Sequence, residues 1–173
     1  CNAASWGRLT LLPSGVTVGL GVKDHNLSVR LQALEGIGRL SQITKSSYHP
    51  RDQSSMITEV RRIVRDSGAL PSERHAALTT LALWGEIQDA SDLLKAHFER
   101  GGLLKLSKSA LYALVIADPT SSLNEIKRAI RSSPSLVMRS YAAQLLVDSR
   151  IKWDHLSSKA DEDTRLTLLK HMI

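Results

Sequence analysis

The spacing of apolar residues in this chain changes once, near residue 27. Before that point, apolar residues alternate with Thr and Gly at Val16, Val18, Leu20 and Val22. This period of two is typical of a half-buried strand, and with the segment RLTLL at 8–12 and the turn Pro13–Gly15 it predicts a β-hairpin. Beyond residue 27 the apolar residues recur three and four positions apart, on one helix face. We therefore expect an N-terminal β-hairpin or extended segment at 1–26 and a helical domain at 27–173.

Prolines, glycines and capping residues divide the helical part into segments. Pro71-Ser72 is typical of a helix start with Ser72 as the N-cap, and Ser122 and Glu125 have capping-box spacing. Gly101-Gly102 is typical of a helix end. The pattern predicts helices at residues 28–43, 54–67, 72–87, 90–100, 105–117, 121–132, 135–148 and 161–172.

Two of the predicted helices are near copies of each other. Residues 57–67 read ITEVRRIVRDS and residues 123–133 read LNEIKRAIRSS. Aligned without a gap, they agree in charge or apolar character at most positions, with Val60 opposite Ile126. Leu94 takes the same place in a weaker middle copy. The spacing indicates repeat units of about 33 residues, with these segments as second helices.

Another motif marks the first helix of each unit. It is an alanine followed by Leu or Ala, at Ala33-Leu34, Ala77-Leu78, Ala110-Leu111 and Ala142-Ala143, and in three of the four an Arg stands three positions earlier. The first unit is longer by about ten residues, in the polar stretch 44–53, which predicts an inserted surface loop. Such a loop lies on the binding face or is a tolerated surface insertion.

Composition favours a helical fold and excludes two kinds of cysteine site. Hydrophobic residues make up 42% of the 173 residues and aromatic residues only 4%, so aliphatic side chains must fill the core, which favours packed helices. The lone Cys1 excludes an intrachain disulfide and a cysteine zinc site. No apolar run approaches the length of about 20 residues that spans a bilayer. We expect an intracellular protein, cytoplasmic or nuclear, and its start at Cys1 leads us to expect part of a larger polypeptide.

The paired helices resemble HEAT repeats, of the short-repeat type in the armadillo-like α-solenoid family. The resemblance covers about 27–149 and rests on the R-x-x-A-A/L motif and on Asp89 and Asp118 at turns. It implies an all-α, right-handed α-solenoid of three to four helix pairs. The chain lacks the proline that is common in the family's first helix, and its inserted loop is also unusual.

In HEAT solenoids the second helices line the concave surface. For this chain, that implies a basic ridge formed by Arg61, Arg65, Lys95, Lys127 and Arg131. Arg62 and Arg128 each follow a glutamate by three residues, so we expect them to pair within their own helices. The net charge of +6 favours an acidic partner. The alternative interpretation of the ridge is a solvated helix face.

These features lead to one main hypothesis and two alternatives. The first is a non-catalytic binding or scaffold module that presents its helical surface to a protein partner or to other domains of the same polypeptide. The second is a basic ridge that grips the DNA or RNA backbone with little sequence readout. The third, an enzyme, is a HEAT-like DNA glycosylase, for which the candidate aromatic residues are Trp84, Trp153 and Tyr112.

Catalytic chemistry has weak support in the sequence. We expect Trp84 and His97 to be core residues, since both fall on apolar helix faces. Arg150–His155 and Arg165–His171 fit the loose R-x4–6-H pattern of HEPN ribonucleases, a match that arises easily in a basic chain. We therefore expect no enzyme, no catalytic residue, no cofactor and no metal site.

Overall fold

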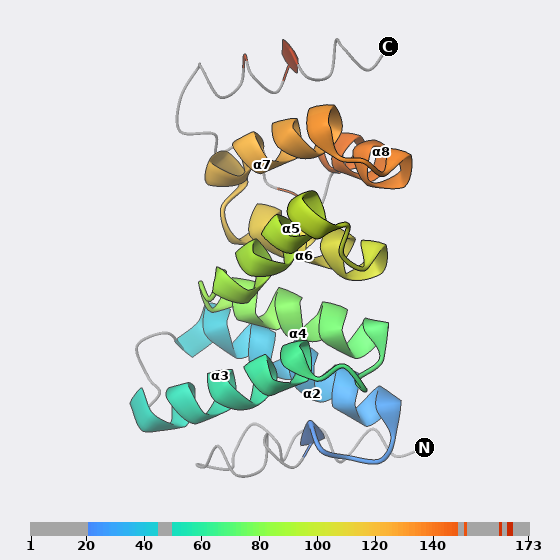
Figure 1. Ribbon diagram of the computed structural model, residues 1–173. Coiled ribbons are helices and arrows are strands. Elements are labelled where there is room, and N and C mark those ends of the chain that lie inside the picture. The colour runs from blue at the N-terminus through green and yellow to red at the C-terminus, as the bar shows by residue number, and fades with distance from the viewer. Residues whose placement is uncertain (1–20, 45–49, 149–150, 152–162, 164–165, 168–173) are drawn as a thin grey trace. The chain divides into compact units, whose positions relative to one another are not determined.

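The computed structural model describes residues 21–44, 50–148, 151, 163, 166 and 167, and the part it describes contains helices and no strand (Figure 1). This confirms the all-α prediction. The helices are α2 (Leu27–Thr44), α3 (Pro50–Arg65), α4 (Pro71–Leu83), α5 (Gln88–Arg100), α6 (Leu104–Ala117), α7 (Pro119–Ser132) and α8 (Leu136–Leu145). The predicted hairpin lies outside the described residues except for Gly21, which is helical, and Val22, which is in a turn. The predicted helix at 161–172 also lies almost wholly outside them.

The start of α4 differs from the prediction. Ser72 is not the N-cap, because the helix already includes Pro71 and the Leu70 carbonyl accepts the Arg74 N–H at 3.0 Å. The Glu73 carboxylate then accepts the Leu70 N–H at 3.1 Å, as the third helical residue does in a capping box. A proline fits the first helical position because it has no N–H to satisfy there.

The start of α7 differs in the same way. Its N-cap is Asp118, whose carboxylate accepts the Ser121 N–H at 3.1 Å, and Pro119 is the first helical residue. The Ser122–Glu125 capping box is therefore wrong. Ser122 lies inside the helix, and its hydroxyl donates to the Pro119 carbonyl at 2.9 Å.

Two glycines with positive φ follow the ends of helices. Gly101 has φ 70° directly after α5, and its N–H donates to the His97 carbonyl, which confirms the predicted end. Gly85 has φ 82° soon after α4, which ends at Leu83 rather than at residue 87. Glycine reaches this left-handed region without the Cβ clash that other residues meet.

Part of the polar stretch 44–53, which we predicted to be a loop, is helical. Helix α2 continues to Thr44 and α3 begins at Pro50. Residues 50–53 are therefore the first turn of α3 rather than loop, and residues 45–49 lie outside the described part. The early proline is compatible with this because it occupies the first helical position.

The contacts within the chain divide it into two compact units, Cys1–Thr80 (unit 1) and Leu81–Ile173 (unit 2). Unit 1 packs α2, α3 and most of α4 around the fully buried side chains of Leu34, Val60, Val64 and Leu78. The Thr80 hydroxyl donates to the Leu34 carbonyl at 2.9 Å and so ties α4 to α2.

Unit 2 has a core of its own. Helix α6 packs against α5, α7 and α8, and α7 also packs against α8. The core side chains include Leu94, Leu111, Ile126 and Met138, each less than 2% exposed. Among the alanines of the predicted motif, Ala110 and Ala142 are also fully buried, whereas Ala33 of unit 1 is half-buried.

Candidate binding surface

Helices α3 and α7 carry the two copies of the repeated segment and expose the same face. Every position from 57 to 63 has the same degree of burial as its counterpart from 123 to 129. Val60 and Ile126 are buried at 1% and 0% exposure, and Leu94 of α5 is buried at 1%. The structure therefore confirms that these three residues are core residues, and their assignment to the second helices of successive repeats stays a prediction.

The same ion pair forms on both copies. Arg62 Nη2 lies 2.9 Å from Glu59 Oε1 on α3, and Arg128 Nη1 lies 4.0 Å from Glu125 Oε2 on α7. This confirms the predicted pairing of both arginines within their helices. The hydrogen bond from Arg62 lowers the pKa of the Glu59 carboxyl, which also lies 3.6 Å from Lys23 Nζ.

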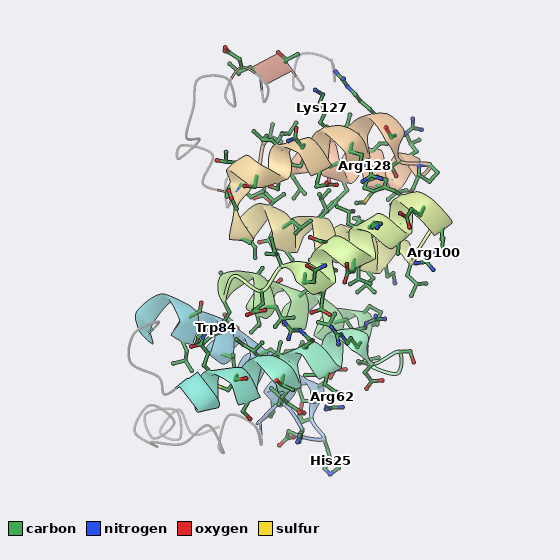
Figure 2. The ribbon with its side chains drawn as sticks, turned by 60° about the vertical axis from the view of Figure 1, so that its left-hand side comes forward. His25, Arg62, Trp84, Arg100, Lys127 and Arg128 are labelled. Atoms are coloured by element: carbon green, nitrogen blue, oxygen red, sulfur yellow. The ribbon has the colours of Figure 1, made fainter. Side chains whose placement is uncertain are left out.

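Arg128 has a second contact that joins α7 to α5. Its guanidinium carbon lies 4.2 Å from the centre of the Phe98 ring, a cation–π arrangement. Figure 2 shows Arg128 on the side of α7 that faces α5. The Arg128 guanidinium is therefore occupied by contacts within unit 2, and we keep Arg128 outside the predicted ridge.

The five predicted ridge residues are divided between the two units. Arg61 is half-buried and Arg65 exposed on α3 of unit 1; Lys95 on α5 and Arg131 on α7 are exposed, and Lys127 on α7 is half-buried, in unit 2. Lys95 Nζ lies 3.9 Å from Glu99 Oε1. Within the described residues of unit 2, Lys127 and Arg131 take part in no ion pair. A continuous ridge across the helices stays a prediction.

A buried histidine holds the end of α5 to the turn between α7 and α8. His97 Nε2 lies 3.1 Å from Ser133 Oγ, and both side chains are less than 5% exposed. Ser133 Oγ also accepts the Ser135 N–H at 3.2 Å. The predicted core location of His97 is thus confirmed, although its buried Nδ1 has no partner among the described residues. The contact joins the last turn of α5 to the turn before α8.

An ion pair that the sequence analysis did not predict joins α2 to α4. Arg30 Nε lies 2.5 Å from Glu73 Oε1, and the same guanidinium donates to the Asp24 carbonyl at 2.7 Å. The hydrogen bond from Arg30 lowers the pKa of the Glu73 carboxyl. The capping role of Glu73 could have been predicted from Pro71, which marks the start of the helix two residues earlier. The pairing with Arg30 could not, because Arg30 lies 43 residues earlier in the chain.

The aromatic residues that were candidates for a glycosylase site differ in burial. Trp84 is buried at 7% exposure, as predicted, and Tyr112 is half-buried, whereas Trp153 lies outside the described residues. No group of three His, Cys, Asp or Glu residues that could hold a metal occurs in the described part of the chain. Within the same residues, no helix has the length and apolar character needed to cross a bilayer.

Comparison of the chain with protein-family models, with curated proteins and with solved structures finds no match in any of the three.

Proposed function

We propose that this protein is a non-catalytic helical-repeat binding module that holds an acidic segment of a protein partner on the exposed cations of its second helices. The observation that carries the proposal is the repeated face of α3 and α7, which share burial, an internal Glu–Arg pair and cations at equivalent positions. Repeat proteins bind extended partners through equivalent positions of successive units. A right-handed HEAT-like solenoid is the architecture that this proposal assumes.

The charge arrangement of α7 gives the most direct support. Lys127 and Arg131 are four residues apart and therefore on one helix face. Arg128 is already engaged by Glu125 and Phe98, so Lys127 and Arg131 are the cations of this helix that a partner can reach. Interactions between such exposed groups are screened by salt, and we expect binding to weaken as ionic strength rises.

Fluorescence anisotropy of the full chain with a labelled Asp- and Glu-rich peptide tests the proposal. The double variant Lys127→Glu, Arg131→Glu should weaken binding at low salt by at least about tenfold, since each reversal replaces attraction by repulsion. The matched control is Lys23→Glu, Arg39→Glu, which makes the same change in net charge at two exposed positions of unit 1. Equal weakening by both double variants would show a non-specific charge effect and contradict the proposal.

A phosphate backbone is the second candidate partner. The specific observation in its favour is the i, i+4 pair of cations on α7, a spacing that can contact successive phosphates without reading bases. A labelled oligonucleotide of mixed sequence, measured beside the acidic peptide at the same salt, separates the two candidates. Tighter binding of the oligonucleotide, with affinity falling steeply with salt, would favour nucleic acid.

A further inference from the structure

Three large apolar side chains of unit 2 are exposed where α6 and α8 begin. Leu103 directly precedes α6 and is 71% exposed; Leu136 and Val137 are the first residues of α8 and are 71% and 54% exposed. None of them contributes to the core of the unit. Apolar side chains exposed together, in contrast to scattered single ones, mark a surface that another molecule covers.

Two contacts bring these side chains to the same end of unit 2. His97 Nε2, in the last turn of α5, lies 3.1 Å from Ser133 Oγ, in the turn that leads to α8. Lys108 and Tyr141 lie about one turn after the starts of α6 and α8, and Lys108 Nζ lies 4.6 Å from the centre of the Tyr141 ring. The first turns of α6 and α8 are therefore neighbours, and in Figure 1 both connecting turns lie on the right-hand side of this unit.

Cations surround the exposed apolar side chains. Arg100 and Lys105 lie three residues before and two residues after Leu103, and Arg139 follows Leu136 by three residues, on the same side of α8. All three cations are exposed, and Figure 2 shows Arg100 projecting from the end of α5. The segments 100–106 and 133–141 contain no Asp or Glu.

We propose that this surface, the turn edge formed by Leu103, Leu136, Val137, Arg100, Lys105 and Arg139, binds an anionic lipid surface. The apolar side chains would enter the boundary between headgroups and acyl chains, and the cations would lie among the phosphates. Lys and Arg suit that position because their long apolar stems leave the charged group at the interface. Each adds attraction to an anionic leaflet, and the apolar burial adds to it.

The position of these residues favours a lipid surface over a protein partner. A peptide helix docks into an apolar groove through contacts at i, i+3, i+4 and i+7. The turn edge instead places its apolar side chains at the ends of two helices, beside turns, where a flat interface can reach all of them. The two segments 100–106 and 133–141 carry cations and no Asp or Glu. Their positive charge complements the negative surface of an anionic leaflet.

Co-sedimentation of the full chain with vesicles tests this proposal. We expect binding to vesicles of phosphatidylcholine that contain phosphatidylserine, and much weaker binding to phosphatidylcholine alone. The double variant Leu103→Gln, Leu136→Gln should lower the partition coefficient by at least about tenfold because two apolar insertions are lost. The matched control is Val147→Gln, which removes a 63% exposed apolar side chain just beyond the opposite end of α8 and should change binding less than about twofold.

Three results would overturn the proposal. One is the absence of binding to the phosphatidylserine vesicles, and another is equal binding by the wild-type chain and the double leucine variant. The third is leucine-dependent self-association in sedimentation velocity without vesicle binding, which would identify a protein–protein interface. Thermal melting followed by circular dichroism controls for folding. If the double variant melts at a lower temperature, Val137→Gln serves as the second test variant under the same criteria.

Discussion

At the residue scale, the contact between Arg30 and Glu73 is the one whose loss should be easiest to measure. The Glu73 side chain is 9% exposed and also accepts the Leu70 N–H, so it joins α2 to α4 and caps α4. Glu73→Gln should lower the free energy of unfolding by about 1 kcal/mol through loss of the charge-assisted bond. The effect stays below that of a fully buried pair because the Arg30 side chain is 21% exposed.

Urea unfolding followed by circular dichroism measures this difference. The matched control is Arg39→Gln, which breaks the exposed pair of Arg39 with Glu35, where the side chains are 72% and 61% exposed. It should cost less than about 0.5 kcal/mol because water screens the pair. A cost for Arg39→Gln as large as for Glu73→Gln would contradict the assigned role of the α2–α4 pair.

The same carboxyl predicts how stability depends on pH. Because Arg30 lowers the pKa of Glu73 below its ordinary value of 4.5, the ionised group stabilises the folded state above that ordinary value. The contribution is lost as the pH falls through the lower pKa of the folded state. The difference in unfolding free energy between the wild-type chain and Glu73→Gln should therefore be constant near neutral pH and shrink in acid. A difference that grows in acid would contradict this account.

At the scale of single helices, the N-cap of α7 is Asp118 in the structure, whereas the sequence predicted Ser122. Asp118→Ala removes the carboxylate that accepts the Ser121 N–H, and it should cost about 1 kcal/mol of unfolding free energy. Asp118→Asn keeps an acceptor there and should cost only a few tenths. Ser122→Ala should cost well under 1 kcal/mol, since Ser122 lies inside the helix and alanine favours helix. Urea unfolding of the three variants checks the order, and a larger cost for Ser122→Ala would restore the predicted capping box.

Helix content was predictable because apolar spacing and repeated segments are local signals. The burial of Val60, Leu94 and Ile126 and the internal pairing of Arg62 and Arg128 both followed from positions within one helix. The helix starts were less predictable, because α4 and α7 each begin at a proline that lies before the serine we predicted as the N-cap. Contacts between helices, such as those of Phe98 and Glu73, depend on side-chain packing between residues 30 to 43 positions apart, which spacing within one helix does not specify.

At the scale of the whole molecule, the division into units has an unusual feature. The boundary between Thr80 and Leu81 falls within the continuous helix α4, so that Ala77 and Leu78 are core residues of one unit and Leu81 and Ala82 are buried in the other. Each unit therefore has buried residues that α4 supplies. In the repeat architecture that we propose, stability passes between neighbouring units, so that a core substitution should act most strongly close to its own position.

Hydrogen exchange tests this expectation for the solenoid architecture. Leu34 is fully buried in unit 1, and Leu34→Ala should cost about 2–5 kcal/mol locally. If stability is passed between nearest neighbours, amide protection should fall most in α2 and α3, less in α4, and least in α8. Ile126→Ala, which removes an equally buried side chain from α7, should reverse this gradient. Equal loss of protection in every helix for both variants would instead show a single cooperative core, and would contradict a repeat architecture for this chain.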